Sequence, residues 1–250
     1  METIIEKTAA LSARISAYTK ENGLDYAARA HALIDELAQI PTRSDAAKAK
    51  VQNDIYHAFA VCMMLIDLHT NLSRAEEDTL LSAALLHIYP NYFPADNIRD
   101  ILVGGYGFSP EVYEIVDSLD FAHMVLEEEQ QEFYARIQEN KLALLVALAD
   151  RGNIIQNLYR FSTWNAHRYI DETKACYYPM CIYGKEHYHE LLAPISVLME
   201  KIRSLLEVSE ILLRRYEVRE AELIQDIQAL REENATIKGI IAKFKGQSAL

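Results

Sequence analysis

The stretch KLALLVALADRGNIIQNLYR, residues 141–160, opens with the strongly apolar run LALLVALAD. A helix that is hydrophobic around its whole circumference is buried inside a protein. The stretch therefore predicts a central core helix at residues 141–160, against which other segments must pack.

Capping and helix-breaking residues divide most of the remaining chain into further helices. Gly184 is expected to separate the last two of them. Gly (8) and Pro (6) are scarce, and few segments have the alternating pattern of strands. The predicted fold class is therefore all-α, with helices expected at residues 3–20, 25–39, 44–71, 73–87, 95–103, 109–119, 165–184 and 186–206.

Composition excludes several function classes. The formal net charge of −12 disfavours binding to nucleic acids and to anionic membrane surfaces. The three cysteines, Cys62, Cys176 and Cys181, form neither a disulfide framework nor a zinc pattern, which is typical of a reducing compartment. The N-terminus has no apolar signal core, and the longest apolar run, Ala58–Ile66, is shorter than the roughly 20 residues of a membrane span. We therefore expect a cytoplasmic protein.

The C-terminal segment has a heptad pattern. Asn234 takes an a position, where a lone asparagine favours a two-stranded register. Asp226 with Arg231, and Glu233 with Lys238, then form pairs of opposite charge between the g and e′ positions of a parallel dimer. This predicts a homodimeric coiled coil at residues 207–246, although a single helix that packs back on its own domain is the alternative. The a and d positions are Leu223, Ile227, Leu230, Asn234, Ile237, Ile241 and Phe244.

Three predicted helices each carry one metal-capable side chain in an apolar setting. These are His57 in HAFAVCMMLIDL, His87 at the end of DTLLSAALLH, and Asp150 in VALADR. Imidazole and carboxylate groups bind divalent cations, and such a cation can polarise a phosphoryl oxygen. Taken singly, each histidine has a simpler interpretation as a hydrogen-bonded core residue. Asp150 could likewise form a structural ion pair with Arg151 or belong to the polar edge of its helix.

Taken together, four segments resemble the hydrolase domain of the RelA/SpoT family, within the HD superfamily. They are HAFAVCMMLIDL, AALLHIYPNY, VALADRGN and ETKACYYPMCIYG, which follow the order of the family motifs HPxxVAxxLADL, LLHDxxED, KLADRxxN and ETLxIYAPLAxRLG. The resemblance covers about residues 45–205. It implies an HD-like helical bundle with a Mn²⁺ site at His57, His87 and Asp150, and a nucleotide ligand. The corresponding domains are N-terminal helices at 1–44, a degenerate HD domain at 45–206 and the coiled coil at 207–246.

The departures from the family pattern concern catalysis. Ile88 stands where the family has the Asp of its His-Asp pair, and Asn91-Tyr92 stands in place of the catalytic acid pair. Ile154 stands where an Asn closes the third motif. Losing a carboxylate ligand weakens affinity for Mn²⁺ or Mg²⁺, and losing the acid pair removes the groups that would activate water.

Three functions remain open from the sequence. The first is a non-catalytic or weakly active dimeric regulatory or ligand-sensing module. The second is a metal-dependent phosphohydrolase that acts on guanosine tetraphosphate or a related nucleotide, and the third is a coiled-coil scaffold. Two histidines and one carboxylate also suit Fe(II) oxygenases, but nothing else in the sequence indicates oxygen chemistry.

One set of tyrosines either stacks on a base or fills half-buried helix faces: Tyr169, Tyr177, Tyr178, Tyr183 and Tyr188.

Overall fold

The computed structural model describes residues 3–42, 44–93, 95–120 and 127–247, with only the backbone described at 95–96, 127–129 and 242–247. Every regular element in these ranges is helical, so the all-α class is confirmed. No helix in the described part of the chain combines the length and the apolarity needed to cross a membrane. The elements are α1 (Ile4–Asn22), α2 (Asp25–Leu37), α3 (Asp45–Ile66), α4 (Arg74–Leu86), η1 (Tyr89–Asn91), α5 (Ala95–Arg99), η2 (Asp100–Gly105), α6 (Pro110–Ser118), α7 (Glu127–Glu139), α8 (Lys141–Gln156), η4 (Leu158–Arg160), α9 (Thr163–Glu172), η5 (Thr173–Tyr177), α10 (Tyr178–His187), η6 (His189–Leu191) and α11 (Leu192–Gln247).

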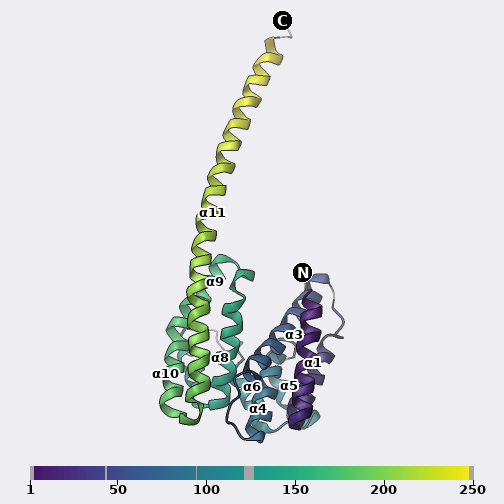
Figure 1. The fold of residues 1–250 in the computed structure, drawn as a ribbon. Coiled ribbons are helices and arrows are strands. Elements are labelled where there is room, and N and C mark those ends of the chain that lie inside the picture. The colour runs from purple at the N-terminus through teal and green to yellow at the C-terminus, as the bar shows by residue number, and fades with distance from the viewer. Residues whose placement is uncertain (1–2, 43, 94, 121–126, 248–250) are drawn as a thin grey trace.

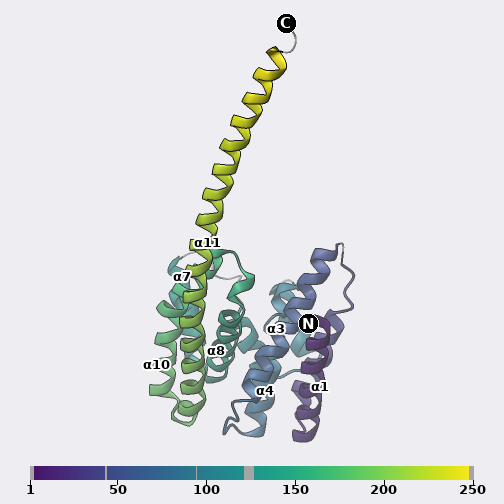
Figure 2. The ribbon, with the colours of Figure 1, turned by 45° about the horizontal axis from the view of Figure 1, so that its top comes forward.

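Helix α8 is the centre of the fold, as its apolar run predicts. Every residue from Leu142 to Ala149 is buried. On one side α8 packs against α3 and α4, and on the other against α7, α10 and α11 (Figure 2). Helices α1 and α2 pack in turn against α3 and α4. Figure 1 shows α1 beside α3. The bundle thus has an N-terminal and a C-terminal half, and α8 joins them.

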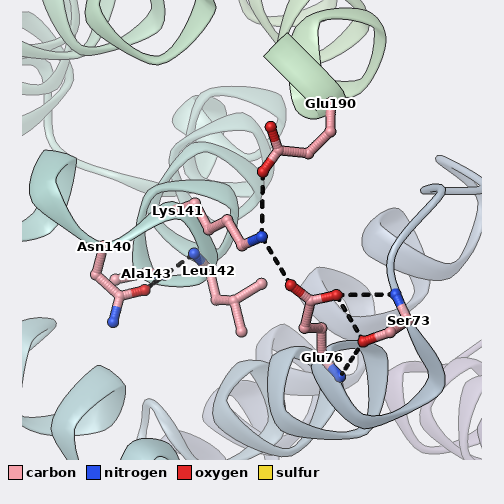
Figure 3. Close-up of polar contacts among 7 residues, drawn as sticks. All are labelled: Ser73, Glu76, Asn140, Lys141, Leu142, Ala143 and Glu190. Carbon is pink, nitrogen blue, oxygen red and sulfur yellow. Dashed lines mark hydrogen bonds and ion pairs between the residues drawn. The ribbon is translucent and has the colours of Figure 1, made fainter. Parts of the chain in front are cut away.

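A polar network connects the two halves at the start of α8 (Figure 3). Lys141 Nζ lies 2.7 Å from Glu76 Oε1 on α4 and 3.1 Å from Glu190 Oε1 in η6. Glu76 also closes a capping box with Ser73, whose backbone N–H and hydroxyl both donate to Glu76 Oε2. One glutamate therefore caps its own helix and holds the central helix.

Stability should depend on pH through Glu76. The hydrogen bonds from Lys141 and Ser73 lower the pKa of Glu76 from 4.5 to about 2. A carboxylate with a lowered folded-state pKa stabilises the fold above pH 4.5, and this contribution disappears as the pH falls towards 2. Urea unfolding should therefore find Glu76→Gln less stable than wild type at pH 7, with a difference that shrinks below pH 4.5.

Glu111→Gln is the matched control, since Glu111 also lies in the first turn of a helix, α6. Its loss of stability at pH 7 should be smaller, because within the described residues Glu111 holds no cation on another helix. A Glu76→Gln difference that stays constant from pH 7 to pH 3 would contradict this account.

Several expected helix boundaries are wrong; among them, the helix expected at 186–206 begins at Leu192 and continues without a break to Gln247. Helix α3 ends at Ile66 rather than near residue 71, because the chain turns at 67–69, where His69 has a left-handed φ of 47°. Gly184 lies inside α10 and separates nothing. A Cβ at Gly184 would lie 2.5 Å from Leu144 Cδ2 and 2.8 Å from Ile195 Cδ1, so the glycine lets α10 pack closely on α8 and α11.

Helix α11 is continuous over 56 residues and extends far beyond the bundle (Figure 1). Its first turns are packed, with Ile195, Leu198 and Ile202 in the core. Every described side chain from Val218 to Ile241 is exposed, and the side chain of Phe244 lies outside the described residues. The heptad segment therefore does not pack back on its own domain, which removes that alternative.

Candidate metal centre

The three predicted metal-binding residues come from three helices and converge at one point. His57 lies in α3, His87 directly follows α4, and Asp150 lies in α8. His57 Nε2 is 2.8 Å from Asp150 Oδ1, and His87 Nε2 is 3.9 Å from the same oxygen. The two Nε2 atoms are 3.1 Å apart. The convergence follows from α8 packing against both α3 and α4.

These separations fit one divalent cation. A cation about 2.1 Å from each ligand atom places neighbouring ligands about 3.0 Å apart in an octahedron and about 3.4 Å apart in a tetrahedron. The observed separations of 2.8, 3.1 and 3.9 Å bracket these values. Two imidazoles and one carboxylate suit Mn²⁺, Fe²⁺ or Zn²⁺, and three protein ligands leave positions open for a substrate.

The outer contacts of the histidines orient their lone pairs towards this point. His57 Nδ1 lies 2.8 Å from Asn153 Oδ1, and His87 Nδ1 lies 2.7 Å from the Ala84 carbonyl oxygen. Both partners are acceptors, so each Nδ1 carries the proton and donates. A neutral imidazole then has its lone pair on Nε2. When both imidazoles are neutral, two nitrogen lone pairs and a carboxylate oxygen face one another, an arrangement that a proton or a cation between them stabilises.

Burial and mutual contacts set the protonation states of the three residues. Burial lowers the pKa of His87 to about 4, which keeps this imidazole neutral. Burial would raise the pKa of Asp150, but the hydrogen bond and charge of His57 hold it below its usual value. Burial opposes charge on His57 as well, yet Asp150 and Asn153 raise its pKa. A proton on His57 is therefore the charge that a bound cation would displace.

A cleft of about 620 Å³ opens beside the three residues. The carboxylates that line it among the described residues are Asp54, Asp120, Asp150 and Glu172, against two guanidinium groups, Arg151 and Arg168. This excess of negative charge favours a cation. Tyr169 and Tyr177 of the tyrosine-rich segment also line the cleft, whereas Tyr183 stacks on His187 outside it.

Of the residues that stand where the RelA/SpoT motifs have acids, Ile88 and Asn91 line the same cleft, and Tyr92 contacts a lining residue. Ile88 is buried in its wall, and Asn91 lies at its edge. Tyr92 donates a hydrogen bond from its hydroxyl to Asp54 at 2.7 Å. Asn153, one residue before the position where the family has its Asn, is the partner of His57.

Asp54 and Asn153 were not singled out from the sequence. Asp54 precedes His57 by three residues, and Asn153 follows Asp150 by three. A spacing of three places two side chains on the same helix face, which is the signal that could have found them.

Arg151 pairs with Glu172 rather than with Asp150, the alternative that the sequence left open. Arg151 is 1 % exposed, and its Nη2 lies 3.0 Å from Glu172 Oε1. Its guanidinium also lies 4.1 Å from the ring centroid of Tyr177, in cation–π geometry. Asp150 faces the two histidines instead, so the structural ion pair and the candidate metal centre use different carboxylates.

Comparison with known proteins adds no relative. No protein-family model matches the chain, and neither does any curated protein or any solved structure. The chemistry of the site comes from its own geometry. Three ligand atoms converge within 4.8 Å of one another, with two histidines held in the ligating tautomer and a cleft beside them.

Proposed function

We propose that this chain is a degenerate HD-type module, similar to RelA/SpoT hydrolases, that binds one divalent cation and with it a phosphate-bearing nucleotide. The convergence of His57, His87 and Asp150 beside a cleft carries this proposal. Because residues 88, 91 and 92 are not carboxylates, we expect slow hydrolysis and a regulatory or ligand-sensing role.

Each part of the cleft has a chemical role in this proposal. Mn²⁺, the metal of the similar family, would supply positive charge that polarises a phosphoryl oxygen when bound at these three residues. Arg168 is exposed at the cleft and lies over the ring of Tyr169, at 5.4 Å from its centroid. Its guanidinium can bind a second phosphate oxygen, and the Tyr169 ring, which lines the cleft, suits contact with a base.

Nucleotide binding with and without metal tests the proposal. Calorimetry with guanosine tetraphosphate should detect binding in the presence of Mn²⁺ and none after chelation. Turnover should stay below about 1 per second, the low end of ordinary enzymes. Rapid metal-dependent turnover would favour the phosphohydrolase instead, and absence of both metal and nucleotide binding would leave the scaffold.

The exposed part of α11 adds a partner to this proposal, a second copy of the chain. An isolated helix is marginal in water, since helices gain most of their stability by packing an apolar face. The exposed side chains of Leu223, Ile227 and Leu230 lie along one such face. Opposite charges at Asp226 and Arg231 suit the parallel pairing of two identical helices.

A charge placed at a core position of the coiled coil should separate the two copies of the chain. Leu230→Asp puts two carboxylates into the interface of a dimer, at a cost of at least ~3 kcal/mol, or about a 100-fold weaker association. Light scattering should find wild-type dimers at micromolar concentration and monomers of this variant. Gln228→Asp, two residues away on the outer face, should leave dimers intact. Monomeric wild type, or equal behaviour of the two variants, would contradict the coiled-coil dimer.

A further inference from the structure

Tyr92 and Asp54 form a pair at the edge of the cleft. The Tyr92 hydroxyl donates to Asp54 Oδ2 at 2.7 Å, and Lys50 Nζ lies 2.7 Å from the same oxygen. Lys50 Nζ also lies 5.2 Å from the ring centroid of Tyr92, so the three side chains contact one another. Two donors therefore fix the Asp54 carboxylate through one of its oxygens.

The other oxygen of Asp54 takes no part in these contacts. Both hydrogen bonds use Oδ2, and Oδ1 has no hydrogen-bond partner within the described ranges. Asp54 lies on the same face of α3 as His57, one turn earlier, and both line the cleft. The Asp54 side chain is 24 % exposed, so water can reach it.

Two other carboxylates of the cleft, Asp150 and Glu172, already pair with other side chains. Asp150 faces the two histidines, and Glu172 pairs with the buried Arg151 and accepts a hydrogen bond from Tyr134. Tyr92 itself occupies a position where the similar family has an acid. Tyr92 therefore binds a carboxylate of α3, Asp54, although position 92 itself has no carboxylate.

We propose that Asp54 is the proton-accepting residue of this cleft, in place of the acid pair at Asn91-Tyr92. The proposal rests on the proposed function and deepens it by assigning the residual hydrolysis. The oxygen of a water molecule forms the new bond to phosphorus while its proton passes to Asp54 Oδ1. The electron pair of the broken P–O bond leaves with the leaving-group oxygen, which takes its proton from solvent. Tyr92 and Lys50 are positioning residues that hold Oδ2.

Asp54→Asn tests this role in the full-length, Mn²⁺-loaded protein. With guanosine tetraphosphate and the chromogenic bis(p-nitrophenyl) phosphate as probes, its turnover should fall at least about 100-fold, as expected for loss of a general base. Its Mn²⁺ content, measured separately, should remain that of wild type. Asp67→Asn, at the exposed C-terminal end of the same helix, is the matched control and should match wild type.

A double variant separates chemistry from folding. Asp54→Asn with Tyr92→Asp returns a carboxylate to the family's position and should recover at least about tenfold of the lost turnover. Melting curves of both variants establish that they fold. Tyr92→Phe, which keeps the ring and releases Oδ2, should lower turnover less than Asp54→Asn does.

The possible failures are distinguishable. Wild type without bound metal overturns the proposed function, and this inference with it. Metal-loaded wild type that hydrolyses neither probe, or an Asp54→Asn variant within about threefold of wild type, overturns the inference alone. Loss of Mn²⁺ from Asp54→Asn would make Asp54 a ligand and would also overturn its assignment as a base.

Discussion

Replacing Glu172 with alanine is expected to lower the free energy of unfolding by about 3–5 kcal/mol, because it leaves a buried guanidinium without its counter-charge. Arg151 is 1 % exposed, and Glu172 is its carboxylate partner at 3.0 Å. The substitution also removes the acceptor of the Tyr134 hydroxyl. Urea unfolding monitored by circular dichroism measures the loss.

The control is a second glutamate in an exposed ion pair. Glu200 pairs with Arg203 at 2.7 Å on the surface of α11, with both side chains more than half exposed. Glu200→Ala should therefore cost no more than about 0.5 kcal/mol. Replacing Arg151 and Glu172 together by methionine should cost less than Glu172→Ala alone, since no unpaired charge remains. Similar losses for Glu172→Ala and Glu200→Ala would contradict the buried pair as described.

Replacing Asp150 with asparagine is expected to weaken Mn²⁺ binding by more than about 100-fold. Loss of a residue that only hydrogen-bonds to a metal ligand weakens metal affinity by about 10- to 100-fold, and loss of a ligand should cost more. The substitution removes the only carboxylate among the three converging ligands. An amide N–H at this position can donate to the His57 Nε2 lone pair, so the protein should stay folded. Calorimetric titration with Mn²⁺ measures the affinity.

Asn153 gives a graded comparison for the same measurement. Asn153→Ala removes the partner of His57 Nδ1 and should weaken Mn²⁺ binding by about 10- to 100-fold, less than Asp150→Asn does. Asp67→Asn, in an exposed ion pair with Arg14, should leave the affinity unchanged. Equal affinities in wild type and Asp150→Asn would place any bound metal elsewhere.

The sequence predicts the fold well because one segment is unambiguous. The run from Leu142 to Ala149 has no polar face, and a helix of this kind can only be central. Helical periodicity does not indicate, however, whether a glycine ends a helix or permits close packing. Gly184 was wrongly expected to be a break, because its role depends on Leu144 and Ile195, distant in the sequence and adjacent in space.

Part of the candidate site was predicted from the sequence, and part was found only in the structure. His57, His87 and Asp150 were selected by their apolar surroundings and by motif order, and the structure brings them together. Their separation in the sequence, up to 93 residues, could not establish contact. The spacing of three residues places Asp54 near His57 and Asn153 near Asp150, but it does not show that Tyr92 contacts Asp54 or that His57 contacts Asn153. The membership of the chain in the RelA/SpoT family stays a prediction.

The central claim is that His57, His87 and Asp150 hold one divalent cation. Its most direct test is the metal content of protein purified without chelator, determined by mass spectrometry alongside His87→Ala. The account predicts about one divalent cation per wild-type chain and a loss of most of it in the variant. Wild-type protein that holds no divalent metal, even after incubation with Mn²⁺, Zn²⁺ or Fe²⁺, would contradict it.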